Sequence, residues 1–241
     1  MSGPLEQFEI KKIIDLNLYG YDISITNSTI WMFVVVASSL LLFSAMCSSR
    51  KLLPGKLQAV GEMLVEFINN IVQVNVGNEG KAFAPFIFTL FWFILLSNLL
   101  GLLPYAFTVT SQIIVTFTLA SMLFVLINIY GLFKHGLHFF SLFLPKGTPS
   151  WLAPLMVLIE LFAYLTRPIS LALRLFANMV AGHILLKILA GFAVSLGLLF
   201  KILPIAFVSC IVGLEFFIAV LQAYIFTILA CVYLNDAINL H

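Results

Sequence analysis

Five polar side chains interrupt an apolar stretch and are the first candidates for chemistry in this chain. The stretch covers residues 159–187, and its polar members are Glu160, Arg167, Arg174, Asn178 and His183. An ionised group at the centre of a bilayer costs ~2.5–3.5 kcal/mol even on the lowest scales. A guanidinium cannot avoid this cost, because it stays charged at any accessible pH. Arg174 is therefore expected to face a partner, a cavity or an ion path.

The spacing of these residues places them on two sides of one helix. At ~100° per residue, Glu160, Arg167 and Arg174 recur every seven positions and share a slowly drifting stripe. Asn178 lies one turn beyond Arg174 on the same side, whereas His183 lies nine residues beyond it and points roughly the opposite way. Small residues, which let another helix approach closely, flank Arg174 at helical spacing, namely Ser170, Ala177 and Ala181.

Taken singly, each of these polar residues also has an ordinary structural explanation. Arg174 could be satisfied by backbone carbonyls, and His183 could be a hydrogen-bonding packing residue. Glu160 could be an interfacial acid stabilised by the positive end of the helix dipole. Arg167 could extend to the inner headgroups. The residues alone leave these alternatives open.

Four longer segments carry a family resemblance. They read PLEQFEI (4–10), NLLGLLPYAFTVTSQ (98–112), LALRLFANMVAGH (171–183) and LEFFIAVLQAYIFTILACVYLNDAINLH (214–241). Together they strongly resemble subunit a of the F-type ATP synthase, the stator proton channel, most densely over residues 145–241. The combination of His183 with Glu215 resembles the mitochondrial and alphaproteobacterial branch of that family.

The resemblance implies an electrostatic mechanism centred on Arg174. This residue matches the family's essential arginine, which favours the ionised carboxylate on each passing rotor subunit and separates an entry from an exit half-channel. Gln222 is implied to lie across a helical hairpin and to orient the guanidinium. Glu160 is implied to line the exit half-channel, and Asp236 is a weaker candidate for the same path.

His183, Glu215 and Asn178 are assigned to the entry half-channel. If Arg174 and Gln222 set the register of an antiparallel helix pair, His183 and Glu215 fall within two residues of each other, roughly 3 Å of rise. They are therefore predicted to be neighbours that titrate as one unit. An imidazole can take and pass protons near neutral pH. Both side chains are also zinc ligands, so an inhibitory zinc ion could bind there, although no metal or cofactor is required.

The resemblance also implies the setting in which the chain works. It would be a non-nucleotide-binding subunit with no catalytic activity of its own, in contact with the c-subunit ring, the peripheral-stalk subunit b, other Fo subunits and lipid, and indirectly with the F1 head. The location would be an energy-transducing membrane, either mitochondrial inner or alphaproteobacterial plasma membrane. Two other classes stay open, a self-contained ion channel or secondary transporter and a structural subunit of a respiratory complex.

The composition independently requires a membrane protein. Of 241 residues, 62% are hydrophobic and 9% are charged, and the mean hydropathy is +1.13. Water-soluble domains of this length do not have that balance. The net charge of +2 is small and its basic residues are scattered, which argues against a nucleic-acid partner. The sequence has no glycine-rich phosphate loop, HExxH motif or nucleophile elbow.

The apolar segments predict an all-α polytopic protein with a single membrane domain after a polar tail over 1–28. Five membrane-embedded helices are expected, at 30–46, 83–103, 113–133, 151–189 and 198–234. The last two approach twice the bilayer thickness at ~1.5 Å per residue, so they are predicted to form a long tilted hairpin. Pro168 offers a place for irregularity within it.

Two further predictions concern the membrane surface. Residues 57–72 place apolar and polar side chains on opposite sides at helical spacing, which predicts an amphipathic helix at the interface or over another subunit. A packing helix between two spans would have the same pattern. Lysine and arginine residues concentrate in the loops after the first and third spans, which predicts an N-terminus on the outer side and a C-terminus on the inner side.

Overall fold

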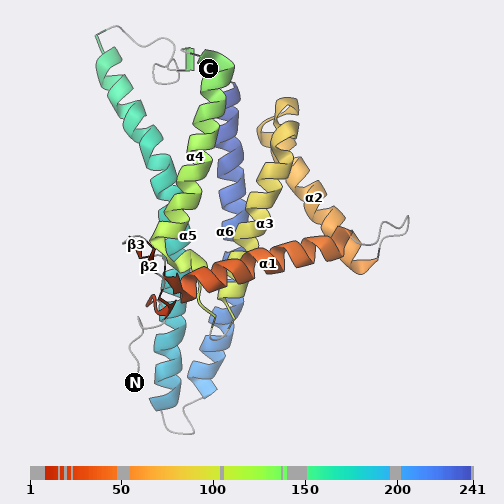
Figure 1. Ribbon diagram of the computed structural model, residues 1–241, viewed down its shortest axis with the longest axis vertical. Helices are drawn as coiled ribbons and strands as arrows, with labels where there is room; N and C mark the ends of the chain where they lie inside the picture. Colours follow the sequence, from red (N-terminus) through yellow and green to blue (C-terminus); the bar gives the residue numbers. More distant parts are fainter. Residues whose placement is uncertain are drawn as a thin grey trace.

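The structure, a computed structural model, is built mainly from long helices (Figure 1). It describes residues 9–15, 17–18, 21–22, 24–47, 55–103, 106–136, 138–139, 151–195 and 202–239. In chain order the α-helices are α1 Asn27–Cys47, α2 Lys56–Asn75, α3 Ala84–Gly101, α4 Ile113–His135, α5 Ala153–Ser195 and α6 Ile202–Ile238. Two short 3-10 helices, η2 Asn78–Phe83 and η3 Val109–Ser111, precede α3 and α4. The predicted all-α polytopic architecture is confirmed.

Within the described ranges, five helices are long and apolar enough to cross a membrane. They are α1, α3 with η2, α4, α5 and α6, and each overlaps one of the segments predicted from the apolar pattern. The 21 residues of α1 give a length of about 31 Å at ~1.5 Å per residue, close to the thickness of a hydrocarbon core. The 43 residues of α5 and the 37 of α6 greatly exceed that thickness.

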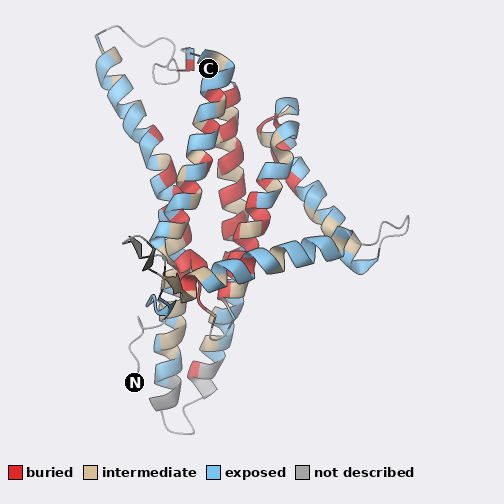
Figure 2. Cartoon of the chain, in the orientation of Figure 1, coloured by how far each residue is buried: buried red, intermediate tan, exposed pale blue. Residues whose placement is uncertain are grey.

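The core of the bundle lies where α3 meets α6. Helix α3 is apolar on every side and more than half buried, as expected for a helix enclosed by others. On α6, the residues that face inward include alanines with almost no exposed surface, Ala219, Ala223 and Ala230. These small side chains recur at helical spacing and let the two backbones approach closely. Figure 2 shows this buried strip on the half of α6 that ends at the C-terminus.

Helices α5 and α6 form the long antiparallel hairpin that the sequence predicts. Helix α5 continues through Pro168, whose side chain is buried, so the proline does not end the helix. The first turns of α5 diverge from α4 (Figure 1). At the opposite end, the hairpin extends past α3 and α4, and its residues there are mostly exposed (Figure 2).

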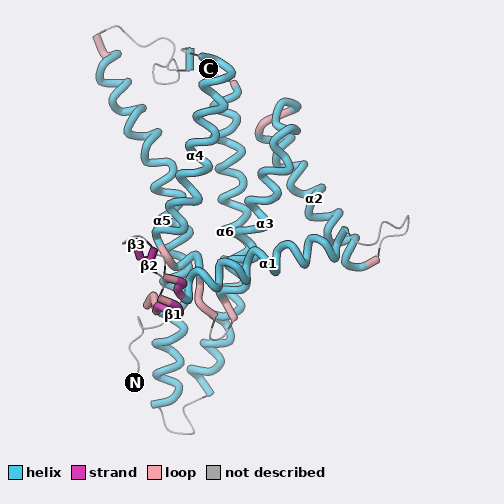
Figure 3. The backbone as a smooth tube through the Cα atoms, viewed as in Figure 1, coloured by secondary structure: helices cyan, strands magenta, loops and turns pink. Residues whose placement is uncertain are grey.

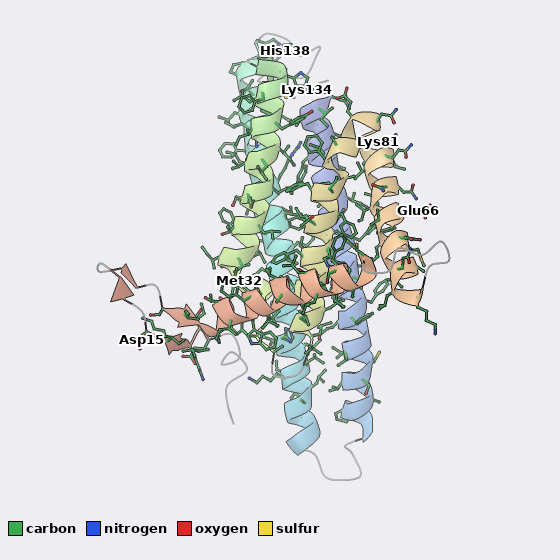
Figure 4. All side chains as sticks on the ribbon, turned by 45° about the vertical axis from the view of Figure 1, so that its right-hand side comes forward. Asp15, Met32, Glu66, Lys81, Lys134 and His138 are labelled. Atoms are coloured by element: carbon green, nitrogen blue, oxygen red, sulfur yellow. The ribbon has the colours of Figure 1, made fainter. Side chains whose placement is uncertain are left out.

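Helix α1 lies across the hairpin instead of along it. In two views that differ by a rotation about the vertical axis, α1 runs nearly horizontally while α5 and α6 run vertically (Figures 1 and 4). Only 11% of its apolar window is buried, so most of its surface contacts no other part of the described chain. If α1 spans a bilayer along the membrane normal, the hairpin is therefore strongly tilted away from that normal.

Helix α2 is the amphipathic helix predicted from the sequence pattern. Its last turns dock on the bundle through Ile68, Ile71 and Val72, which are buried. Its earlier apolar residues remain exposed, including Leu57 and Met63. The bundle therefore covers only part of the apolar face, which leaves the rest for the bilayer interface or another chain.

Two short strand pairs precede α1, beside its first turns (Figure 3). Strand β1 (Lys12–Ile14) pairs antiparallel with β4 (Ile25–Thr26), and β2 (Asn17–Leu18) pairs with β3 (Tyr21–Asp22). The Asn27 side chain ties them to α1, because Nδ2 donates to the Glu9 carbonyl at 3.1 Å and Oδ1 accepts from the Lys11 amide at 3.2 Å. The sequence predicts a polar surface tail with one short helix here, and the described residues form strand pairs instead. Strands of two or three residues are too short to show a period.

Candidate functional site

A cavity of about 220 Å³ lies between α5 and α6 on the side of the hairpin nearer its turn. Its lining includes His183, Glu215 and Asn178, together with Leu102 from the end of α3. The structure thus places the two predicted neighbours, His183 and Glu215, at one shared space. This volume is large enough for several water molecules, because a single water occupies about 30 Å³ in the liquid.

Glu215 is the polar group most deeply enclosed at this cavity. It is 7% exposed, and both of its carboxylate oxygens lack a hydrogen-bond partner in the described part of the chain. Gly182 on α5 packs directly against it, so that a Cβ at Gly182 would collide with Oε1. A buried acid of this kind must be neutral, hydrated or paired with a group that is not part of this chain.

His183 is half-buried and reaches a different partner. Its Nε2 lies 2.9 Å from the hydroxyl oxygen of Thr108, in the connection between α3 and α4. The same hydroxyl donates to the carbonyl of Gly101 at 3.1 Å. The imidazole is thereby linked to the end of α3, while the cavity holds its other neighbour, Glu215.

Gln222 is buried, and its amide oxygen accepts a hydrogen bond of 2.8 Å from Asn178 Nδ2. This bond joins α5 to α6 one turn away from Arg174. The structure therefore brings Gln222 together with Asn178, and no hydrogen bond joins Gln222 to Arg174 among the described residues. Its amide nitrogen, Nε2, is buried without a partner in this part of the chain.

Arg174 lies on the outward surface of α5. It is exposed, and no hydrogen bond or ion pair joins its guanidinium to another residue of the described ranges. The exposed side chains beside it on α5 carry no charge, namely Ser170, Leu173, Ala177 and Asn178. A permanent cation on a membrane helix needs an anionic or polar partner, and no acidic side chain of the described residues forms an ion pair with Arg174.

Arg167 has the opposite surroundings. It pairs with Asp236 of α6, with Nη1 at 2.7 Å from Oδ2, and its guanidinium lies about 5 Å from the ring centroids of Tyr164 and Tyr233. The Tyr164 hydroxyl in turn donates to Asn128 on α4 at 2.6 Å. These contacts join three helices. Arg167 thus has an ion pair and two cation–π contacts within the chain, which accounts for its charge structurally.

The remaining candidates lie at the end of the hairpin away from its turn. Glu160 is half-buried, close to the start of α5. Asp236 is near the end of α6 and is held by Arg167. Along α5, Arg174 therefore lies between Glu160 on one side and His183 on the other.

Three positions near the cavity were not singled out by the sequence patterns. Thr108 contacts His183, Gly182 makes room for Glu215, and Asn98 on α3 is fully buried, with Nδ2 donating to the Ala219 carbonyl at 3.3 Å. Each contact joins segments far apart in the chain, which helical periodicity does not relate. Polar residues inside apolar helices, such as Asn98, do carry a signal of their own.

The described residues contain no group of three or more metal-ligating side chains. His183 and Glu215 supply two potential zinc ligands at the shared cavity.

One comparison with known proteins relates this arrangement to a family. The family model for the ATP synthase A chain matches residues 29–235. This range includes the cavity, both arginines and, almost completely, the five described helices that are long and apolar enough to cross a membrane. Its members are non-catalytic, proton-translocating subunits of the Fo sector in energy-transducing membranes. The chain belongs to the ATP synthase A chain family.

Proposed function

We propose that the hairpin forms two proton half-channels and that Arg174 separates them while facing the carboxylates of the c-ring. The observation that carries this proposal is the contrast between the two arginines. Arg167 is paired with Asp236 inside the chain, whereas Arg174 is exposed and makes no hydrogen bond or ion pair in the described ranges. A charge kept on a membrane-facing surface implies an anionic partner on another chain.

The surface around Arg174 fits a close helical partner. Ser170, Ala177 and Ala181 are exposed and small, so a helix of a neighbouring subunit can approach the α5 backbone. A ring of subunits that each carry one carboxylate would present its acids to the guanidinium in turn. The planar guanidinium would favour the ionised carboxylate as it passes and oppose direct proton transfer between the two sides.

The cavity at Glu215 is the proposed entry half-channel. It offers a carboxylate without a hydrogen-bond partner among the described residues, an imidazole and the Asn178 amide around one space. Water in this space would link these groups to the outer side, and the Asn178–Gln222 bond leads from the cavity toward Arg174. We assign His183, Glu215 and Asn178 to entry on this basis, with protons as the coupling ion because an imidazole exchanges protons and does not favour sodium.

The exit half-channel is assigned to the other end of the hairpin. Glu160 has no hydrogen bond or ion pair among the described residues and lies near the start of α5. Asp236 borders the same end, but its bond to Arg167 holds the carboxylate in place. We therefore give the proton-carrying role to Glu160 and place Asp236 at the edge of the path.

A self-contained channel or transporter fits these contacts less well. Such a protein would satisfy a membrane cation with an acid of its own chain, as Arg167 and Asp236 do here. The packing roles left open for Arg174 also fit poorly, because the residue is exposed and makes no hydrogen bond or ion pair in the described ranges.

Replacing Gly182 by alanine tests the entry half-channel. The new methyl group would collide with Oε1 of Glu215, so the carboxylate would have to leave its position at the cavity. Passive proton flux through membranes stripped of the F1 head should fall by at least ~10-fold. Gly191→Ala is the matched control, because Gly191 is exposed on the same helix and its Cβ would meet no atom within 4 Å.

If both glycine variants assemble and keep the wild-type proton flux, the assignment of this cavity to proton entry is contradicted. Loss of flux in both would point to a general sensitivity of α5.

Replacing Glu160 by glutamine tests the exit half-channel. The amide keeps the size of the side chain but cannot carry a proton, so proton release on the inner side should slow by roughly tenfold. An enclosed proton-transfer group contributes a factor of about 10²–10⁴ to the rate. The effect at Glu160 should be smaller, because this side chain is half-buried and water can take over part of its role. Stopped-flow measurement of proton release from vesicles, with Glu66→Gln on α2 as the matched control, would show this. An unchanged rate of proton release would show that Glu160 is an interfacial acid with no role in the exit path.

A further inference from the structure

Arg167 and Arg174 are two permanent cations on one side of α5. They are seven residues apart, so their directions around the helix differ by only about 20° and their positions along it by ~10 Å. Arg174 is exposed without a hydrogen bond or ion pair in the described ranges, whereas Arg167 is bound by Asp236 of α6. Without that bond, both cations would be available to the carboxylates of the ring.

Arg167 lies on the boundary between the exposed and the buried side of α5. Its neighbours at helical spacing are the exposed Ala163 and Ser170 on one flank and the buried Tyr164 and Leu171 on the other. A long arginine side chain can reach either flank from this position. The exposed flank is continuous with the small residues of the surface proposed for the ring, so a partner helix seated there would pass this position as well.

Asp236 holds the guanidinium of Arg167 on the buried flank. Its Oδ2 lies 2.7 Å from Nη1, and the two side chains are only 25% and 23% exposed. The rings of Tyr164 and Tyr233 lie 5.0 and 5.1 Å from the guanidinium carbon. The rings attract the cation, but only the carboxylate neutralises its charge. Asp236 is therefore the group that makes this position favourable for a permanent cation.

We propose that Asp236 is a positioning residue that keeps Arg167 away from the ring carboxylates. Of the two arginines on this side of α5, Arg174 alone then meets a passing carboxylate. This inference rests on the proposed function, and it adds the means by which the chain keeps the second cation out of the path.

A freed Arg167 would oppose the uptake of protons by the ring. At an effective dielectric constant of about 20, a unit charge ~10 Å from a carboxylate favours the ionised form by about tenfold. Arg167 lies between Arg174 and Glu160, and Glu160 is the proposed site of proton exchange with the inner side. During ATP-driven pumping the ring takes up protons from that side. With Asp236 in place, the opposite charges of the pair largely cancel at this distance.

Asp236→Asn is therefore expected to lower ATP-driven proton pumping by about tenfold in the assembled complex. The asparagine keeps the size of the side chain and removes the charge that holds Arg167. Adding Arg167→Gln removes the freed cation, so the double variant should recover most of the lost pumping. Arg167→Gln alone should retain most of the wild-type rate, because it leaves no competing cation. Acidification of inverted vesicles measures all four proteins.

The competing explanation is that the ion pair acts only as a strut between α5 and α6. A strut fails when either partner is removed, and Arg167→Gln also removes the two cation–π contacts. A strut thus gives a loss in Arg167→Gln at least as large as in Asp236→Asn, with no recovery in the double variant. Those results would overturn the inference. A tenfold loss in Arg167→Gln, or its failure to assemble, would do so even if Asp236→Asn did not assemble.

Glu79→Gln is the matched control. Glu79 forms an ion pair with Lys134 that joins η2 to the end of α4, so its removal also frees a cation, but one that is not on α5. The contact of 2.9 Å between His135 Nε2 and the Ile238 carbonyl shows that this end of α4 lies beside the end of α6. Pumping should stay at the wild-type rate. A tenfold loss in Glu79→Gln would show that any freed cation near this end is harmful, and it would overturn the special role of Asp236.

The Arg174→Ala complex separates this inference from the proposed function. If Arg174→Ala pumps at the wild-type rate, the proposed function is wrong and the inference falls with it. If Arg174→Ala stops pumping while Asp236→Asn pumps at the wild-type rate, only the role of Asp236 is wrong.

Discussion

Arg174→Ala is expected to abolish ATP-driven proton pumping while the complex still assembles. The residue is exposed on α5 and makes no hydrogen bond or ion pair in the described part of the chain, so its removal leaves no unpaired group inside this subunit. The substitution should instead remove the interaction between Arg174 and the carboxylates of the neighbouring ring subunits. Arg174→Lys should also fail largely, because a flexible ammonium does not reproduce a planar group with five donors. Acidification of inverted vesicles measures the coupled activity.

Arg167→Lys is the matched control for this experiment. An ammonium can keep the ion pair with Asp236 and part of the contact with the two tyrosine rings, so pumping should persist. The two lysine variants therefore separate an arginine needed for its charge inside the chain from one needed at a boundary with another chain. Coupled pumping at the wild-type rate in Arg174→Ala would refute the central role of this residue.

Exchanging His183 and Glu215 should show that they act as one unit. Each single variant, His183→Glu or Glu215→His, leaves two groups of the same kind at the cavity and is expected to lower proton entry on the order of 100-fold. The double variant restores one acid and one base around the same space and should recover about tenfold, the range of coupling between contacting residues. Proton flux in all four proteins of the cycle gives the coupling directly.

The outcome that would count against this pair is simple additivity. If the double variant shows only the sum of the two losses, the two side chains work separately despite their common cavity. Gly182 must be kept in every variant, since its missing side chain is what leaves room for the group at position 215.

Apolar length and polar spacing predicted most of the helical framework. Segments of about 20 apolar residues gave α1, α3 and α4, and the much longer apolar runs gave the α5–α6 hairpin. Pro168, the predicted place for irregularity, lies inside α5, which continues across it. The strand pairs before α1 had no detectable pattern, since their pairing depends on a few backbone bonds and on Asn27.

Contacts between distant segments were the part that spacing could not supply. The stripe of Glu160, Arg167 and Arg174 gives three equivalent positions on one helix, and only the approach of α6 distinguishes them by pairing Arg167 with Asp236. The register of the hairpin correctly brought His183 and Glu215 to one cavity. Thr108 lies 75 residues before His183, in a connection whose path no periodicity describes.

The orientation of α1 across the hairpin has an electrical consequence. Glu160 and His183 are separated by 23 residues of α5, about 34 Å at ~1.5 Å per residue. On a helix standing upright this would span the whole hydrocarbon core, whereas on a slanted helix much of it is sideways displacement.

Under the proposed function, a ring carboxylate that moves past Arg174 travels parallel to the membrane and does little work against the transmembrane voltage. The voltage acts instead on protons within the two half-channels, where 100 mV is worth about 2.3 kcal/mol per charge. At about 1.36 kcal/mol per pH unit, that voltage across the entry path equals roughly 1.7 pH units at the carboxylate. The slant of the hairpin would thus convert an electrical gradient into a local change of proton activity.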